Sequence, residues 1–259
     1  MAEAPSHQYA TAPLALHAHP ERTGGRAVGV LLVHGFTGSP ASMKPWAHAL
    51  AEHGYAVEVP LLPGHGTRWQ DLNRVAWTDW YAEAEAAFDR LRASCEAVVV
   101  GGMSMGGSVA LRLAEEREEE VSGILLVNVF ISSTRKELVA LPVLKHLVPS
   151  LRGVINDIKK PGQDEHGYPR LPLKGLAAVT QMWKVVVPDL HRVTQPVLSF
   201  RSSADHVIDP SSSPTVLRGV SSVDVEERVL DNSYHVATLD HDADRIFAES
   251  AEFVARVAS

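Results

Sequence analysis

Residues 101–107 read Gly-Gly-Met-Ser-Met-Gly-Gly (GGMSMGG), with four glycines around a single serine. It follows the apolar run 97–100 (AVVV) and precedes a segment with the pattern of a helix. A side chain held on a very sharp strand-to-helix turn needs neighbours without a Cβ, because the backbone there is strained and closely packed. A phosphate-binding loop also places glycines here, but it requires Gly-Lys-Ser/Thr at its far end, which the sequence lacks. The stretch therefore predicts a nucleophile elbow, Gly102-Met103-Ser104-Met105-Gly106, with Ser104 as the nucleophile.

Apolar segments of strand length alternate with amphipathic segments of helix length on both sides of this turn. Most of the apolar segments are continuous Val/Leu/Ile runs, as expected where helices cover both faces of a sheet. The chain is therefore predicted to form an α/β fold with a mostly parallel, doubly wound sheet. Thr78 or Asp79 is expected to cap the second of the helices. The predicted strands are 28–33, 56–60, 97–101, 123–129, 196–201 and 223–230, and the predicted helices are 42–52, 77–92, 105–116 and 242–257.

The alternation is interrupted once, between about residues 132 and 190, where strands disappear and six prolines occur. The segment is too long for an ordinary loop, so an insertion with its own helices is expected within a single domain spanning 1–259. Its stretch 140–148 (ALPVLKHLV) is markedly apolar for a surface excursion.

Composition limits the classes of partner and compartment. The chain has 259 residues, a formal net charge of −7 and a pI near 6.0, which gives no electrostatic support to a nucleic-acid or anionic-membrane partner. No apolar run approaches the length of a membrane span, and residues 1–25 lack the pattern of a signal peptide. The single cysteine, Cys95, allows no intramolecular disulfide and fits a reducing compartment. The sequence therefore predicts a cytoplasmic protein.

Two later loops contain the partners that a serine nucleophile needs. A serine hydroxyl requires a base near neutral pH, and the base requires an orienting carboxylate, in the chain order Ser, Asp/Glu, His for this type of fold. The loop after the strand 196–201 offers Asp205 and Asp209, and the loop after 223–230 offers His235. Asp205 is preferred because it is nearer the strand end, whereas Asp209 precedes a proline and is expected to cap the next helix. Parallel strands bring these loops to the edge where Ser104 lies.

The oxyanion of an acyl-transfer intermediate needs two preorganised N–H donors. One is expected from Met105, the residue after the nucleophile, and the other from Phe36 in the early loop HGFTGSP (34–40). His34 is expected to support this loop structurally, and Gly64-His65-Gly66 is expected to form a tight turn nearby. His206 and His241 are expected to be surface or capping residues. The predicted mechanism requires no metal and no organic cofactor, and the thirteen histidines show no metal-ligand spacing.

Taken together, five segments resemble the α/β-hydrolase superfamily, and within it the bacterial monoacylglycerol lipases and related small carboxylesterases. The resemblance implies that Ser104, Asp205 and His235 form the catalytic triad and that Phe36 and Met105 form the oxyanion hole. It also implies that the insertion 132–190 is a cap over the active site, and that the short chain before residue 28 makes this a shortened hydrolase. The segments are HGFTGSP (34–40), GHGT (64–67), GMSMGG (102–107), SADHVIDP (203–210) and NSYHVATLD (232–240).

The expected reaction is hydrolysis of monoacylglycerols to fatty acid and glycerol through an acyl-serine intermediate. The apolar stretch 140–148 suits contact with a fatty chain or a lipid aggregate. Glu165, between Asp164 and His166, is a candidate contact for a small hydroxylated head group, although a solvated loop explains this segment equally well. Phe36 is expected to line the acyl pocket. Two alternatives stay open: a general carboxylesterase acting on short- to medium-chain esters, and a non-catalytic ligand-binding protein of the same fold. The sequence leaves the oligomeric state open.

Overall fold

The computed structural model describes residues 10–259. Part of the segment in which no signal peptide is expected, residues 1–9, lies outside the described residues. Within the described part, no helix is long and apolar enough to cross a lipid bilayer.

A seven-stranded sheet forms the centre of the molecule, with the strand order β1-β3-β2-β4-β5-β8-β9. Every neighbouring pair is parallel except β1 and β3, which are antiparallel. The six predicted strands are therefore confirmed, with ends that shift by a few residues, and the short edge strand β1 was not predicted. The strands are β1 (Leu14–Leu16), β2 (Val28–Val33), β3 (Ala56–Val59), β4 (Ala97–Met103), β5 (Gly123–Val127), β8 (Val197–Ser202) and β9 (Val225–Leu230).

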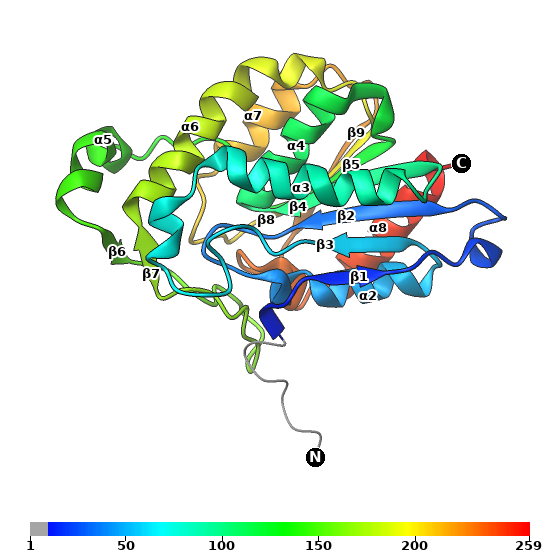
Figure 1. The fold of residues 1–259 in the computed structure, drawn as a ribbon, viewed down its shortest axis with the longest axis horizontal. Helices are drawn as coiled ribbons and strands as arrows, with labels where there is room; N and C mark the ends of the chain where they lie inside the picture. The colour runs from blue at the N-terminus through cyan, green and yellow to red at the C-terminus, as the bar shows by residue number, and fades with distance from the viewer. Residues whose placement is uncertain (1–9) are drawn as a thin grey trace.

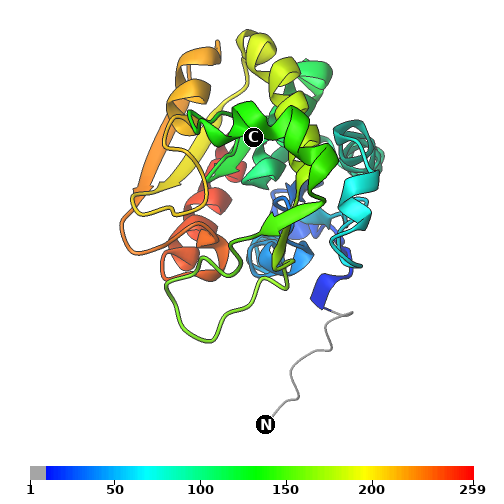
Figure 2. The same ribbon diagram turned by 90° about the vertical axis from the view of Figure 1, so that its left-hand side faces the viewer.

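Helices cover both faces of this sheet (Figures 1 and 2). Residues of α3, α4 and α6 pack on one face in a large buried cluster, and residues of α2 and α8 pack on the other. Strand β2 shows why the apolar runs are continuous: Leu31 joins the first cluster and Leu32 the second, and both are fully buried. The α-helices are α2 (Lys44–Glu52), α3 (Trp77–Arg92), α4 (Met105–Arg117), α5 (Glu137–Leu147), α6 (Leu173–Asp189), α7 (Ser212–Gly219) and α8 (Ala243–Val257).

Short 3-10 helices connect several of these elements, and α3 begins at Trp77 as predicted, although its capping residue differs from the expected one. Of the two residues expected to cap α3, Thr78 and Asp79, neither occupies the N-cap position, which is Ala76, but the side chain of Asp79 does cap the start of the helix. The Asp79 carboxylate acts from inside the first turn, where it accepts the backbone N–H of Ala76 at 2.8 Å. The 3-10 helices are η1 (Pro20–Arg22), η2 (Pro40–Ser42), η3 (Asp71–Arg74), η4 (Glu118–Glu120), η5 (Leu190–Arg192) and η6 (Ala237–Leu239).

The stretch 132–190 contains α5, a small antiparallel pair of strands, β6 (Ser150–Arg152) and β7 (Arg170–Pro172), and α6. In Figure 1, α5, β6 and β7 lie at the end of the molecule toward which the arrowheads of β2 and β3 point. Helix α6 extends from this end along the sheet, and its residues Val179, Met182 and Val186 are buried in the same cluster as α3 and α4. The segment thus stands over the carboxyl ends of the parallel strands, where ligands bind in open α/β sheets.

Candidate active site

Ser104 lies on a strained turn between the last residue of β4 and the first residue of α4. Its backbone has φ 55° and ψ −122°, a region that non-glycine residues rarely adopt. Neighbouring backbone holds this conformation, because the N–H of Ser104 donates to the carbonyl of Val127 at 2.9 Å and the carbonyl of Ser104 accepts the N–H of Phe130 at 3.0 Å. The turn has the geometry of the predicted nucleophile elbow.

Two glycines make the turn possible. A Cβ at Gly102 would lie 2.2 Å from the backbone of Gly106, and a Cβ at Gly106 would lie 2.0 Å from the carbonyl oxygen of Val33. Neither contact can be relieved by rotating a side chain, because both involve backbone atoms. The Gly-x-Ser-x-Gly spacing is therefore a steric requirement of bringing α4 back across the ends of β4 and β2.

His235 and Asp205 meet in a short, nearly buried hydrogen bond. The Nδ1 of His235 lies 2.7 Å from Oδ2 of Asp205, and the two side chains are 8% and 9% exposed. The other carboxylate oxygen of Asp205 accepts the N–H groups of Val207 and Ile208 at 2.8 and 2.9 Å. A proton on Nδ1 that is held by Asp205 leaves Nε2 as the acceptor nitrogen of the imidazole.

The electrostatics of this pair favour a charged carboxylate beside a basic imidazole. Burial alone would lower the pKa of His235, but the carboxylates of Asp205, Glu165 and Asp157 raise this pKa above its ordinary value. Burial alone would raise the pKa of Asp205, but His235 and the two backbone N–H groups bring this pKa below its ordinary value. Asp205 therefore stays ionised at neutral pH, and the pair can stabilise an imidazolium.

Asp209, the other aspartate considered from the sequence, lies with different partners. Its carboxylate accepts the N–H of Ser211 at 2.9 Å and both the N–H and the hydroxyl of Thr134, at 2.9 and 2.8 Å. These bonds hold its pKa well below the ordinary value. Because Ser211 immediately precedes α7, Asp209 fastens the loop that leads into this helix to the start of the segment 132–190, although Ser211 itself occupies the capping position.

The early loop 34–40 packs directly against Ser104. A Cβ on Gly35 would lie 3.2 Å from Cβ and 3.7 Å from Oγ of Ser104, so the backbone that leads to Phe36 runs beside the hydroxyl. Thr37 has a φ of 64° and continues the tight turn. Met105 is the first residue of α4, where backbone N–H groups have no partner within the helix. Both predicted N–H donors, Phe36 and Met105, therefore flank Ser104.

Two buried histidines lie beneath this loop. His34 accepts the N–H of Leu62 on Nε2 at 3.2 Å, and its Nδ1 lies 3.0 Å from the carbonyl of Gly35. Burial lowers the pKa of His34 to about 4, so that the ring is neutral near pH 7. His65 packs edge-to-face on His34 with ring centroids 4.8 Å apart, between Gly64 and Gly66, which both have positive φ. These contacts match the structural role expected for His34 and the turn expected at 64–66.

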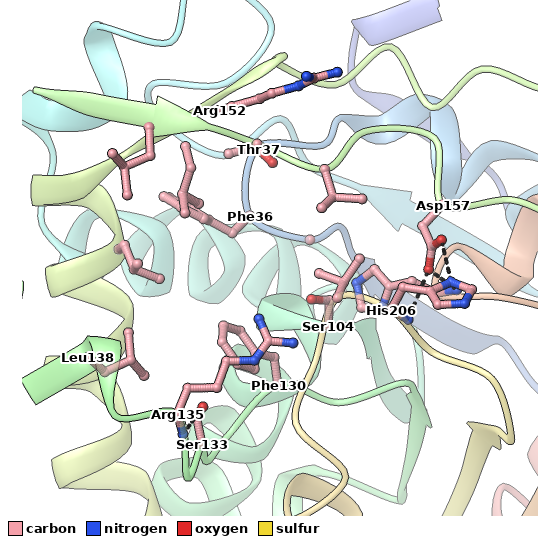
Figure 3. A pocket seen from close by; sticks show the side chains of 18 of the residues that line it. Phe36, Thr37, Ser104, Phe130, Ser133, Arg135, Leu138, Arg152, Asp157 and His206 are labelled. Carbon is pink, nitrogen blue, oxygen red and sulfur yellow. Dashed lines mark hydrogen bonds and ion pairs between the residues drawn. The ribbon is translucent and has the colours of Figure 1, made fainter.

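A cavity of about 580 Å³ opens in front of Ser104 and has two unlike ends. Figure 3 shows Leu138 and Asp157 on opposite sides of Ser104. Phe36 and Phe130 border the middle, and Asp157, Glu165 and His206 supply polar groups on the second side. The apolar end is lined by leucines of α5, α6 and the β6–β7 pair, namely Leu138, Leu141, Leu144, Leu151, Leu171, Leu173 and Leu176.

Glu165 is built into the polar end. Its Oε1 accepts the N–H of Asn156 at 2.9 Å, its own N–H donates to Oδ1 of Asn156 at 3.0 Å, and its carbonyl accepts the hydroxyl of Ser39 at 2.9 Å. The other oxygen, Oε2, lies 3.4 Å from where a Cβ on Gly38 would stand, beside the early loop. Burial raises the pKa of this carboxyl. Glu165 is therefore an ordered wall of the cavity rather than part of a solvated loop.

The structure also contains site residues that the sequence did not reveal. Asn128, directly after β5, has a φ of 45° and donates from Nδ2 to the carbonyl of His235 at 2.8 Å. Its Oδ1 accepts the N–H of Ser202 at 2.7 Å. The only signal for it in the sequence is an asparagine, which tolerates positive φ, at the end of an apolar run.

Among residues 10–259, no group of three or more His, Cys, Asp or Glu side chains is arranged to hold a metal ion.

The fold and the elbow site define this chain as an α/β-hydrolase, which confirms the predicted fold class. Residues 26–242 match the family described as serine aminopeptidase, S33 (Hydrolase_4), and the chain belongs to this family. A thermostable monoacylglycerol lipase from Bacillus sp. (strain H-257) is 38% identical over 258 residues, which cover 97% of this chain and 98% of that protein. A carboxylesterase from Bacillus subtilis (strain 168) is 23% identical over 229 residues, covering 88% and 92%.

Solved structures agree with this assignment. A structure from a study of LipS and LipT, two metagenome-derived lipolytic enzymes, superposes with a TM-score of 0.89 at 34% identity, covering 95% of this chain and 98% of that one. The monoacylglycerol lipase of Paleococcus ferrophilus shares the fold with a TM-score of 0.76 at 19% identity, covering 95% and 98%. The predicted relationship to monoacylglycerol lipases and small carboxylesterases is therefore confirmed.

Proposed function

We propose that this chain is a serine ester hydrolase that cleaves monoacylglycerols to fatty acid and glycerol through an acyl-serine intermediate. The observation that carries the proposal is the two-ended cavity at Ser104, with a chamber lined mainly by leucines on one side, which Arg135 also borders, and a polar recess formed by Asp157, Glu165 and His206 on the other. A monoacylglycerol has the same division, a long apolar chain joined to a small hydroxylated head by one ester bond. The relationship to a monoacylglycerol lipase supports the same substrate.

In the proposed mechanism, Ser104 attacks the ester carbonyl while Nε2 of His235 accepts the hydroxyl proton. The N–H groups of Phe36 and Met105 donate to the oxyanion of the tetrahedral intermediate. Collapse of the intermediate breaks the bond to glycerol, and the imidazolium of His235 protonates the leaving oxygen. Water then attacks the acyl-serine by the same sequence of proton transfers and releases the fatty acid. Asp205 remains ionised and keeps the proton of His235 on Nδ1.

The segment 132–190 is proposed to act as a cap that belongs to the single hydrolase domain. Helix α5 and the β6–β7 pair form its roof, and α6 joins the roof to α4 through buried apolar residues. The acyl chain would lie beneath α5, and the chamber there is closed on its far side by Leu141, Leu173 and Leu176, which are buried together. A reducing, cytoplasmic compartment is proposed on the grounds that the one cysteine, Cys95, is a free, buried thiol.

A substrate panel tests the proposed function. We expect kcat/KM for a long-chain monoacylglycerol to exceed the values for the corresponding triacylglycerol and for a short p-nitrophenyl ester. An aminoacyl p-nitroanilide belongs in the panel because the family is named for an aminopeptidase activity. A preference for short p-nitrophenyl esters over every monoacylglycerol would favour the general carboxylesterase instead, and faster turnover of the anilide would overturn both.

Replacing Glu165 with glutamine tests the head-group contact. Glu165 lines the polar end of the cavity, one of its oxygens already accepts the N–H of Asn156, and a hydrogen bond from a substrate hydroxyl to a charged carboxylate is stronger than one to a neutral amide. We expect KM for monoacylglycerol to rise by about tenfold or more, with kcat/KM for p-nitrophenyl acetate nearly unchanged. Steady-state kinetics on both substrates measures the difference. An equal loss on both esters would contradict a head-group role.

Transient contact with lipid aggregates is proposed for the outer face of α5. Val139, Val143 and Leu147 recur at intervals of four residues and are 82%, 66% and 75% exposed, which places them on one face of the helix. Replacing Val143 and Leu147 with serine is expected to reduce the hydrolysis of monoacylglycerol in vesicles while sparing a monomeric ester in solution. Vesicle co-sedimentation and the two rates provide the measurement. Equal rates on vesicles for the variant and the wild type would exclude this face as the contact.

A further inference from the structure

Asp157 occupies the junction between the cap and the two loops that contain Asp205 and His235. It belongs to the connection between β6 and β7, far from either loop in the sequence, and its side chain is only 10% exposed. Figure 3 shows it beside His206, with its carboxylate directed toward His206. Neither the Ser104 chemistry nor the head-group contact proposed for Glu165 uses this carboxylate.

One oxygen of Asp157 joins the two loops. Its Oδ2 accepts the backbone N–H of His206 at 3.2 Å and the backbone N–H of His235 at 3.1 Å. Its Oδ1 lies 2.8 Å from Nδ1 of His206. His206 directly follows Asp205, so this bridge connects the neighbour of the orienting carboxylate to the backbone of the base. Hydrogen bonds from N–H groups to an ionised carboxylate are among the stronger ones in proteins.

The loop of His235 is thus held from two sides. The core holds its carbonyl through Nδ2 of Asn128 at 2.8 Å, and the cap holds its N–H through Asp157 at 3.1 Å. The backbone carbonyl of Asp157 also accepts the N–H of Val236 at 3.1 Å, which extends the contact by one residue. A rotation of the peptide at His235 would break bonds on both sides.

The cap segment that contains Asp157 is itself anchored to the same region. The carboxylate of Asp240 accepts the backbone N–H of Lys159 at 2.6 Å, of Lys160 at 2.9 Å and of Tyr234 at 2.9 Å. Asp240 therefore ties the segment after Asp157 to the loop that leads to His235. The position of the cap and the position of the base are consequently linked by several hydrogen bonds rather than by one.

We propose that Asp157 is a positioning residue, supplied by the cap, that holds the Asp205 and His235 loops in the register needed for proton transfer from Ser104. This inference rests on the proposed triad and deepens it. It makes the correct position of the cap a condition for His235 to act as the base. Misplacing a reacting group by about 1 Å can cost about 10²-fold in rate, and loss of the Asp157 bridge frees the backbone on both sides of the Asp205–His235 bond.

The test uses the full chain with Asp157→Ala and Asp157→Asn. With p-nitrophenyl acetate, which needs neither the acyl chamber nor the head-group recess, kcat of the alanine variant is expected to fall by about 10²-fold while KM stays nearly unchanged. The rate of Ser104 labelling by a small fluorophosphonate is expected to fall in parallel. The amide of the asparagine variant keeps an acceptor oxygen, so Asp157→Asn is expected to retain an intermediate rate. Asp231→Ala, an exposed aspartate near His235 in the chain, is the matched control and is expected to behave like the wild type.

The pH profile separates positioning from a purely structural role. The ionisable side chains around His235 come from two segments. Asp205 and His206 belong to the loop after β8, and Glu165 and Asp157 belong to the connection between β6 and β7; His206 is in contact with Asp157. Removing the negative charge of Asp157 takes away one of the influences that raise the pKa of His235. The acid limb of kcat/KM is therefore expected to move to lower pH in Asp157→Asn. The melting temperatures of all variants are measured alongside, so that only folded protein is compared.

The outcomes are distinct. A folded Asp157→Ala variant with wild-type kcat and labelling rate overturns the inference, as does a loss confined to KM for monoacylglycerol, which would make Asp157 a head-group contact. A wild-type enzyme that labels at Ser104 but spares monoacylglycerol overturns the proposed substrate, and the Asp157 measurements on p-nitrophenyl acetate still stand. A wild-type chain that does not label overturns the triad and, with it, this inference.

Discussion

Replacing Ser104 with alanine is expected to lower kcat for ester hydrolysis by about 10⁶-fold and to abolish labelling by a fluorophosphonate. In the proposed mechanism, the hydroxyl of Ser104 is the atom that forms the acyl intermediate. His235→Ala is expected to cause a loss of similar size, because the serine hydroxyl then has no base to accept its proton. The residual rate in both variants would come from the N–H donors of the oxyanion hole and from substrate binding.

Steady-state kinetics with a p-nitrophenyl ester, supported by circular dichroism to confirm folding, measures both effects. Ser94→Ala is the matched control, because Ser94 lies in an exposed turn before β4, at the opposite end of that strand from Ser104. Activity of Ser104→Ala within tenfold of the wild type would show that the nucleophile lies elsewhere. Because Ser104 and His235 act as a unit, the double variant is expected to lose little more than either single variant.

The second large effect is expected at Asp205. Asp205→Asn is expected to lower kcat by about 10⁴-fold, because an amide cannot hold the Nδ1 proton of His235 as a carboxylate does and favours the wrong tautomer. The hydrogen bond concerned is 2.7 Å long and almost fully buried, so water cannot replace the lost partner. Near-normal kcat at pH 7 would show that another carboxylate orients the base.

Asp209→Asn is the matched comparison, because it is an aspartate in the same loop with no bond to His235. Its bonds to Thr134 and Ser211 secure the start of the segment 132–190, so the variant is expected to lose thermal stability while kcat stays within about tenfold of the wild type. Melting temperature and kcat, measured on the same preparations, distinguish the two aspartates. A reversal of the two effects would reverse the roles inferred for them.

Much of the fold could be read from the sequence because its signals are local. The continuous apolar runs marked strands that are buried on both faces, and the glycines around Ser104 marked a turn that only glycine permits. The edge strand β1 was not predicted, because it has only three residues and none of them is fully buried. The start of α3 was predicted correctly at Trp77, but Ala76 was not predicted as its N-cap, because Asp79 accepts the N–H of Ala76 from inside the first turn rather than from the capping position.

The candidate site was predictable to the extent that its residues lie in motifs next to strand ends. Ser104, Asp205 and His235 each follow a strand, and parallel strands bring their carboxyl ends to one edge. Asn128 and Asp157 have no motif around them, and their roles depend on hydrogen bonds to backbone that lies about a hundred and about eighty residues away in the chain. No pattern of residue spacing along the sequence predicts hydrogen bonds of this kind.

The α/β architecture and the elbow could be predicted from the amino-acid sequence because they follow from short-range sterics and from the pattern of apolar residues, and the family could be predicted from the resemblance of five short motifs. Asp205 was already preferred over Asp209 from the sequence, and Glu165 was already a candidate contact; only the structure reveals that Asp157, from the connection between β6 and β7, joins them beside His235. Only the structure also shows that leucines gather at one end of the cavity and polar side chains, Asp157, Glu165 and His206, at the other. The physical reason is that these features are made by side chains from separate elements, whose meeting is set by packing of the whole sheet and cap rather than by any one segment.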